Sequence, residues 1–492
     1  MCGATFEPVT ANKNRKISMK FVWKLLLICL FFLLVTGVFI PKTALSITTT
    51  EEEELSREFM KVILKSVKFV EDPAIVNYVN KIGEKIVSVL SPQPFTYRFY
   101  IIKEDVYNAF ATPAGHIFIY SGLMAAMDNE EELAGILGHE IAHVLCRHIS
   151  QKIDRSKKIS IATLAGIAAG IFLGAEGAGE VGSAVIVGSM AAGQSMALAY
   201  SREDERQADQ IGLKHLTKAG YSGYGLLTML SKIRSKQWFG TEQIPTYLTT
   251  HPAPEERLAH IGTWLEKNRK KPLSGTDSGE FKRVNTRLVA LYGDETVALQ
   301  KYKSAVAKNP KNPMANYGYG LLLARIGNRK DAAVYIKRAL ERDAFNPEFL
   351  VALGRIYFLD GQYEKALTIL ESAVSIAPDD PEGLFYIGRT QMELGRFKDA
   401  ESTLNILTQK HPDYKPGFYF LGNTYGKQGK LADAHYTLGI YYTKKGEDKN
   451  AIIQFKKALE KTTDPYRREE IENLLKKVSK SYAQEKKETK TN

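Results

Sequence analysis

Two histidines and a glutamate lie in one five-residue segment, His-Glu-Ile-Ala-His, at positions 139–143. Residues four apart share a face of an α-helix, so a helix here would let His139 and His143 bind the same zinc ion. Glu140 lies one step round that helix, where its carboxylate could reach a water molecule on the metal. Zinc lowers the pKa of such a water to about 7, and a carboxylate can then take its proton. The segment predicts metal-assisted hydrolysis with Glu140 as the catalytic base.

The residues around this motif distinguish a buried metal site from an ordinary surface helix. A five-residue pattern also occurs by chance on the polar face of amphipathic helices. Here the flanking positions are apolar: Leu133, Ile136, Leu137, Ile141 and Val144. A buried helix that carries histidines and a glutamate needs partners for them, because unpaired buried polar groups cost several kcal/mol. A bound metal would supply such a partner.

A hydrolytic zinc site needs a third protein ligand and an open fourth position. His148 is the nearest candidate, but on a helix over Glu131–His148 it lies nine residues after His139 and faces about half a turn away. The metzincin pattern also fails, because Cys146 and Ile149 stand where it needs glycine and histidine. The third ligand must come from another part of the chain.

The charged run at residues 201–209 is the best source of that ligand. It reads Ser-Arg-Glu-Asp-Glu-Arg-Gln-Ala-Asp and follows an apolar segment. Glu205 and Asp209 lie one turn apart on the same helix face. Glu205 could bind zinc while Asp209 orients a histidine by a hydrogen bond. The alternative is a solvated charged helix face, which is the commoner fate of such runs.

His-Glu-x-x-His followed by Glu-x-x-x-Asp, with alanine before the aspartate, resembles the family of CAAX prenyl proteases and HtpX peptidases. The resemblance implies a zinc-dependent metalloendopeptidase with an α+β zincin (gluzincin) catalytic domain and one Zn²⁺ per subunit. In that family the glutamate three residues before Ala-Asp is the third ligand, which is Glu205 here. Glu203 and Asp204 do not match that position.

Two further segments are similar to the same family. The stretch from Asn108 through Gly115 and Ile117 resembles its edge-strand segment, which implies that an extended substrate pairs there by strand addition; a plain structural hairpin is the alternative. His251 begins a His-Pro loop similar to the family's downstream loop. His251 would then act in catalysis by donating to the transition-state oxyanion, or cap the zinc at rest. Arg257 would tie this loop down.

The C-terminal half repeats itself every 34 residues. One set of positions 34 apart is Gly320, Gly354, Gly388 and Gly422. A 34-residue period with Leu-Gly, Tyr, Ala and Pro at set positions is the tetratricopeptide pattern, which stacks helix pairs into an α-solenoid. The last unit begins only 17 residues after its predecessor. One helix has therefore been lost, or the helix over 431–445 serves two units.

The predicted organisation is mainly α, with four segments. Residues 1–46 are a signal peptide or an N-terminal anchor, 48–270 a metallopeptidase domain, 279–463 the repeats, and 464–492 a C-terminal helix and basic tail. Within 48–270 the pattern predicts helices over 51–66 and 74–90 and strands over 95–102 and 115–120. The turn-rich stretch 271–280 is a linker.

Charge and targeting signals indicate where the protein works. Five basic residues precede the apolar run 25–40, which is long enough for an export signal and short for a membrane span. Export predicts the periplasm or cell envelope. The apolar 159–200 hairpin predicts membrane-surface contact, with core packing as the alternative. The net charge of +12 is scattered, and no nucleic-acid motif occurs.

The expected partners are unfolded or extended polypeptides, and outer-membrane assembly machinery is a further candidate. A chaperone or assembly adaptor with little proteolysis is the competing hypothesis, since solenoids of this kind commonly bind proteins on their concave face. Because the chain keeps Glu140, the sequence favours the enzyme.

Overall fold

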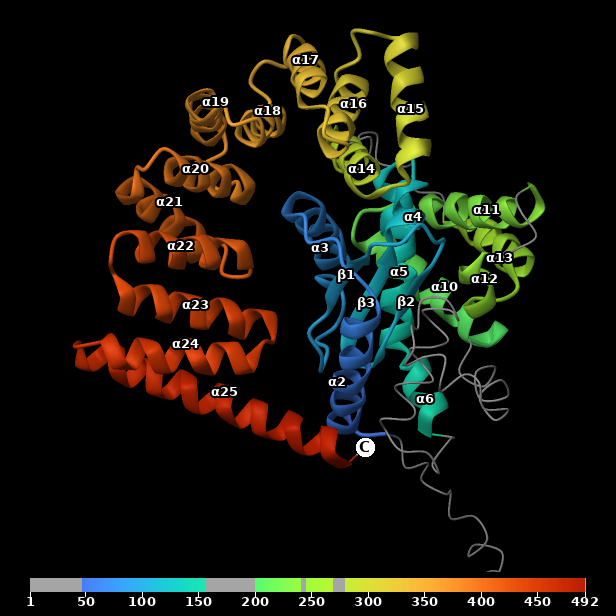
Figure 1. Ribbon diagram of the computed structural model, residues 1–492. Helices are drawn as coiled ribbons and strands as arrows, with labels where there is room; N and C mark the ends of the chain where they lie inside the picture. The colour runs from blue at the N-terminus through green and yellow to red at the C-terminus, as the bar shows by residue number, and fades with distance from the viewer. Residues whose placement is uncertain (1–46, 155–199, 240–244, 269–278, 492) are drawn as a thin grey trace, which may run out of the picture. The chain divides into compact units, whose positions relative to one another are not determined.

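The computed structural model describes residues 47–154, 200–239, 245–268 and 279–491 (Figure 1). The predicted signal segment at 1–46 lies outside these residues, as do nearly all of the 159–200 hairpin and most of the 271–280 linker. Among the described residues, no helix is both long and apolar enough to cross a lipid bilayer.

The N-terminal part of the described chain combines helices with one small sheet. Its elements in order are α2 (Thr49–Ser66), α3 (Pro73–Val87), β1 (Arg98–Ile102), β2 (Ala109–Ala111), the 3₁₀ turn η1 (Pro113–Gly115), β3 (His116–Tyr120), α4 (Ser121–Ala125), α5 (Glu130–Leu145), α6 (His148–Asp154), α10 (Arg202–Lys218), α11 (Tyr224–Phe239), α12 (Thr246–Thr250) and α13 (Pro254–Lys267). The predicted helices and strands are present with shifted ends. The α+β character predicted for this part is therefore confirmed.

The three strands have the order β1-β3-β2. β3 pairs in parallel with β1 and antiparallel with β2, so the backbone of Ile117 is matched with Phe99 on one side and Ala111 on the other. The prediction that Ile117 lies on a substrate-binding edge is therefore wrong. Gly115 is also not in a strand: it ends η1 with φ of 89°. Among the described residues the two edge strands are β1, which Phe69 bridges at Ile102, and β2, which begins directly after Asn108.

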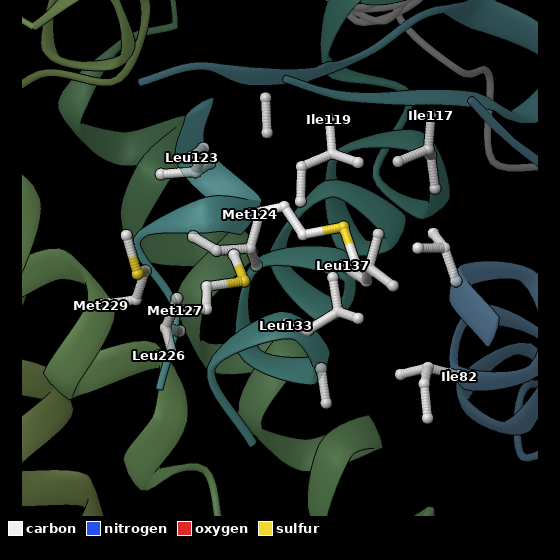
Figure 2. Close-up of a cluster of buried hydrophobic side chains, with 14 of the residues drawn as sticks. Ile82, Ile117, Ile119, Leu123, Met124, Met127, Leu133, Leu137, Leu226 and Met229 are labelled. Atoms are coloured by element: carbon white, nitrogen blue, oxygen red, sulfur yellow. The ribbon is translucent and has the colours of Figure 1, made fainter. Parts of the chain in front are cut away.

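α5 runs through the centre of this part and is buried along almost its whole length. Figure 2 shows Leu133 and Leu137 of α5 among Ile117 and Ile119 of β3 and the methionines of the α4 region. Burying such side chains contributes about 1.5–3 kcal/mol each. The helix that carries the His-Glu-x-x-His motif is thus fixed by the core rather than exposed on the surface.

α5 ends at Leu145, earlier than predicted. Cys146 caps it, and Arg147 takes a left-handed conformation with φ of 55° before α6 begins at His148. The predicted single helix over Glu131–His148 is therefore wrong at its C-terminal end. His148 belongs to a separate helix, so its facing cannot be computed from the helical period.

From α14 onward the described chain consists of helices, and from α16 onward consecutive helices pack as pairs (Figure 1). They are α14 (Gly279–Tyr292), α15 (Glu295–Lys308), α16 (Pro313–Arg325), α17 (Arg329–Leu340), α18 (Pro347–Leu359), α19 (Tyr363–Ile376), α20 (Pro381–Glu393), α21 (Phe397–Lys410), α22 (Lys415–Lys427), α23 (Leu431–Lys445), α24 (Asp448–Lys461) and α25 (Pro465–Thr491). Asn312, Asn346 and Asp380 each cap a helix that begins with proline. These Asx-Pro pairs start the first helix of a repeat.

α23 resolves the irregular spacing of the last unit. Gly422 of α22 lies so close to α23 that an added Cβ would meet Leu438 Cγ at 2.9 Å. Gly439, on α23 itself, stands in the same relation to α24, where a Cβ would meet Phe455 Cε1 at 2.5 Å. α23 is therefore the second helix of one pair and the first helix of the next, which confirms the alternative that one helix serves two units.

Replacing Gly439 by alanine tests this packing. The added methyl group would overlap the Phe455 ring, and overpacking of this kind costs about 1–3 kcal/mol. Gly426 of α22 is the matched control, because it is exposed and an added Cβ meets nothing within 4 Å. Gly426→Ala is expected to stabilise the helix by about 0.5–1 kcal/mol. Thermal unfolding of both variants measures the difference, and an unchanged midpoint for Gly439→Ala would contradict the double role of α23.

Candidate metal centre

Two helices cross where the predicted ligands lie. An added Cβ on Gly138 of α5 would meet Leu216 Cγ of α10 at 2.8 Å, and one on Gly212 of α10 would meet the Gly138 carbonyl oxygen at 3.0 Å. The two backbones therefore approach as closely as only glycine allows. His139 follows Gly138 directly, and α10 carries Glu205 and Asp209. The crossing brings the charged run to the histidines.

Four donor atoms from three parts of the chain converge at this crossing. His139, His143, Glu205 and His251 are all buried and form one group that could hold a metal ion. The Nε2 atoms of His139 and His143 are 3.0 Å apart, and Glu205 carboxylate oxygens lie 3.4 Å from the first and 3.3 Å from the second. Tetrahedral zinc ligands at bond lengths of 2.0–2.2 Å lie about 3.3 Å from each other. The donor set has the size and the chemistry that zinc requires.

His251 supplies the fourth donor. Its Nδ1 lies 3.0 Å from a Glu205 carboxylate oxygen and 3.4 Å from His139 Nε2. The ring stacks on Tyr247 of α12 with centroids 4.2 Å apart, and its backbone N–H donates to the Tyr247 carbonyl. Ala253 then turns the chain with φ of 58° into α13. The loop after α12 thus aims one imidazole at the two motif histidines.

Asp209 and Arg257 lie directly behind the ligands. Asp209 Oδ1 lies 2.9 Å from His139 Nδ1, so the carboxylate fixes which ring nitrogen of His139 faces the ligand group. Arg257 donates to both oxygens of Asp209, at 2.8 and 2.9 Å, and also pairs with Glu205. His260 of α13 contacts Asp209 at 3.1 Å. Arg257 therefore joins α13 to both carboxylates of α10.

The charges in this group determine its protonation. Burial alone would raise the pKa of Glu205, but Arg257 and the hydrogen bonds from His139 and His143 hold it well below its usual value. Burial also opposes a charge on His139, yet its bonds to Asp209 and Glu205 raise its pKa to about 9. Burial lowers the pKa of His143 well below its usual value. A bound divalent cation would replace a proton among these groups.

Glu140 is the one member of the motif outside the donor set. Both carboxylate oxygens are buried, and neither accepts a hydrogen bond from any described residue. His251 Nε2 lies 3.7 Å from Oε1. Burial raises the pKa of this carboxyl above its usual value. An unpaired buried carboxylate is costly, and such groups occur where a protein needs a base near its substrate.

Several contacts at this site carry no sequence signal of their own. Tyr200 stacks on His143 with ring centroids 3.7 Å apart. His148 Nδ1 lies 2.9 Å from His143 Nδ1, although His148 is not among the four donors. The prediction that His148 is not a ligand agrees with this geometry, but the reason is its position on α6 rather than its facing on α5. Tyr200 and Tyr247 could not have been found without the fold.

A small cavity opens beside the donor group. Its lining includes Ala111 of the edge strand β2, Pro113 of η1, and His143 and Val144 of α5. The cavity therefore connects the edge of the sheet with the candidate metal centre. Asn108 lies just before this edge and is buried, but Gly115 and Ile117 are not in the cavity lining.

Comparison with known proteins agrees with this geometry. Residues 74–265 match the model of Peptidase family M48. Tetratricopeptide repeat models match residues 293–347, 325–381, 357–422 and 432–460. The chain thus carries an M48 metallopeptidase domain, of a zinc-dependent family, followed by tetratricopeptide repeats.

Individual relatives each match part of the chain. The chain is 27% identical over 242 residues to the beta-barrel assembly-enhancing protease of Escherichia coli (strain K12), which covers 49% of each protein. It is 28% identical over 281 residues to a putative beta-barrel assembly-enhancing protease of Vibrio cholerae, covering 56% of this chain and 57% of that protein. Mitochondrial metalloendopeptidase OMA1 of Schizosaccharomyces pombe is 25% identical over 39% of this chain and 54% of its own. The chain matches about half the length of these curated relatives.

Proposed function

We propose that this protein is a zinc-dependent metalloendopeptidase of the bacterial cell envelope that cleaves misfolded or stalled envelope and outer-membrane proteins. The observation that carries the enzymatic part is the donor group of His139, His143 and Glu205 with the unpaired Glu140 carboxylate beside it. A structural metal site would have no use for a buried base without a partner. The names of the relatives, which are proteases linked to β-barrel assembly, support the envelope part.

The chain's own groups have distinct roles in this proposal. Zinc, when bound, polarises the scissile carbonyl and makes water a nucleophile near neutral pH. Glu140 takes the proton of that water and later gives it to the leaving amine. Its raised pKa brings it closer to the working pH, which suits a group that both accepts and donates. Asp209 holds His139, and Arg257 holds Asp209 and Glu205, so these two ligands are in position before substrate arrives.

An extended polypeptide fits the surroundings of the site. β2 is an edge strand of the sheet formed by the described residues, and we place the substrate backbone alongside it by strand addition. That edge leads into the cavity next to His143. Backbone pairing demands little of the substrate sequence, which suits unfolded proteins. The repeats would bind the substrate or a protein partner, with outer-membrane assembly machinery as one candidate.

Metal removal and return tests this function. The purified protein is expected to contain one zinc per chain and to cleave unfolded casein. A chelator should abolish cleavage, and added zinc should restore it. Elemental analysis and a gel-based cleavage assay provide both readings. A protein that retains its zinc and its fold but leaves casein intact at every zinc concentration would contradict the peptidase proposal.

The donor group also offers a reason to consider the adaptor alternative. Structural zinc sites have four protein ligands, whereas catalytic sites keep one position open. Here His251 brings the number of donors to four. A chaperone or assembly adaptor with an idle zinc site would have such a closed set. In the enzyme, His251 must leave its place when substrate binds.

His251→Ala separates these two cases. If His251 caps a catalytic site at rest, its removal opens that position and casein cleavage is expected to rise by about threefold or more, because a larger fraction of molecules is competent. If His251 instead donates to the transition state, cleavage should fall by about 10²–10³-fold. In an idle structural site, only zinc affinity changes and casein stays intact. The geometry favours the first result, since Nδ1 lies within the donor group.

A further inference from the structure

A chain of hydrogen bonds leads from His143 back to the helix that carries Glu205. His143 Nδ1 lies 2.9 Å from His148 Nδ1, and His148 Nε2 lies 3.0 Å from the side-chain carbonyl oxygen of Gln207. His148 is buried. Gln207 is two residues after Glu205 on α10. α10 therefore supplies one donor directly, through Glu205. Through Gln207 it also contacts His148, the ring that lies behind the donor His143.

The direction of these bonds follows from the acceptor at the end. A carbonyl oxygen can only accept, so His148 Nε2 carries a proton and donates it to Gln207. In a neutral imidazole the other nitrogen, Nδ1, is then an acceptor. His143 Nδ1 must carry the proton in the bond between the two rings. His143 Nε2 is left with its lone pair, and this is the atom that faces Glu205 and His139.

The opposite direction would prevent metal binding. If Gln207 donated through its amide nitrogen, His148 Nδ1 would carry the proton and His143 Nδ1 would accept it. His143 would then hold its own proton on Nε2, inside the donor group. Only the orientation with Gln207 as acceptor leaves His143 able to bind a cation.

The turn between α5 and α6 holds His148 in place for this role. Arg147 has φ of 55°, which breaks the helix between His143 and His148. Its guanidinium Nε donates to the buried Glu52 of α2 at 2.7 Å. A conformation that non-glycine residues rarely take is thus stabilised by a specific ion pair. The early end of α5 therefore allows the rings of His143 and His148 to meet, which a continuous helix would not.

We infer that His148 and Gln207 are positioning residues for His143. They hold its ring in place and fix its proton on Nδ1, so that Nε2 can bind the metal. This inference rests on the zinc site of the proposed function. It assigns His148 a role different from that of a ligand. Partners behind metal-binding histidines typically contribute 10–100-fold to metal affinity.

Two replacements of His148 test the inference. His148→Leu removes the acceptor for His143 Nδ1 but leaves an apolar side chain of comparable size. Its zinc affinity, measured by competition with a chromophoric chelator, is expected to fall about 10–100-fold. His148→Asn keeps an acceptor, because the asparagine Oδ1 stands where histidine has Nδ1. Its affinity is expected to stay within about threefold of the parent.

Gln207 gives an independent pair of variants. Gln207→Glu keeps an acceptor for His148 and should retain zinc affinity. Gln207→Met has a similar shape but no acceptor and should weaken zinc binding. Thermal unfolding of the metal-free proteins serves as a check that each variant folds. Zinc affinities that are equal in His148→Leu, Gln207→Met and the parent would overturn the inference, as would a loss in His148→Asn as large as that in His148→Leu.

These outcomes are separate from those for the proposed function. A parent protein that binds no zinc would contradict the proposed function itself. If the parent protein binds zinc tightly and His148→Leu and Gln207→Met bind it equally well, only the positioning role of His148 and Gln207 would be contradicted.

Discussion

Glu140→Gln is expected to lower casein cleavage by about 10²–10⁴-fold, the range that proton transfer by a positioned side chain contributes. Glutamine has nearly the same shape as glutamate but cannot take a proton from water. Because Glu140 lies outside the four-donor group, the variant should bind zinc as the parent does. The cleavage rate and the zinc content of the same preparation measure the two effects.

The fold should survive this change. The Glu140 oxygens accept no hydrogen bond from any described residue, so a neutral amide removes no hydrogen bond and avoids the cost of a buried charge. The melting temperature of Glu140→Gln is therefore expected to equal or exceed that of the parent. Glu256→Gln is a suitable control for the change of glutamate to glutamine. Glu256 pairs with Arg206 on the surface, and both side chains are partly exposed. Cleavage by Glu140→Gln at the parent's rate would rule out Glu140 as the base.

The ligands on α5 and α10 were predictable from sequence because helical spacing is a local property. His139 and His143 are four residues apart, and a regular helix is enough to place them together. Glu205 needed the resemblance to a known family, because nothing in its own neighbourhood separates it from Glu203. The physical reason for its position is the crossing at Gly138 and Gly212, and this close approach shows only in three dimensions.

The prediction failed where the chain leaves regular structure. His148 was assessed by the helical period, but Arg147 breaks the helix one residue earlier. The edge position predicted for Ile117 rests on the resemblance of its segment to the family's edge strand, and β-branched and aromatic residues look alike in edge and central strands. Strand order depends on contacts distant in sequence, such as those between β1 and β3. The domain boundaries predicted near 270 and 279 fall where the structure describes few residues, so they remain predictions.

The repeats behaved differently because their period repeats one local packing contact. Each glycine of the 34-residue set faces a residue 16 positions later, as Gly354 faces Leu370 and Gly388 faces Leu404. The packing contact in one helix pair therefore predicts the same contact in the next pair. The same contact between Gly439 and Phe455 explains why the spacing could shorten without disrupting the stack.

A buried ion cluster joins the peptidase domain to the repeats. Arg287 of α14 donates to Asp72 at 2.7 Å and also pairs with Glu382 of α20. Asp72 is the N-cap of α3, where its other carboxylate oxygen accepts from the backbone of Ala74. Only 3% of Arg287 is exposed. One guanidinium thus neutralises two carboxylates from segments more than 300 residues apart in sequence.

Arg287→Met is expected to cost about 3–5 kcal/mol of folding free energy, because it leaves the buried Asp72 carboxylate without a counter-charge and Glu382 with Arg355 as its remaining partner. Arg283→Met is the matched control on the same helix. Arg283 pairs with Glu348 at 3.0 Å, but both side chains are about 30% exposed, so its loss should cost at most about 1 kcal/mol. Denaturant unfolding measures both.

Neutralising the two carboxylates provides a rescue of Arg287→Met. Adding Asp72→Asn and Glu382→Gln keeps the cap on α3 but removes the uncompensated charge, so part of the lost stability should return. If Arg287→Met cost no more than Arg283→Met, the cluster would not hold the two parts together. If instead the triple variant were no more stable than Arg287→Met, lost packing and not unpaired charge would be the cause. The contacts favour charge, since Arg287 donates to both acids at once.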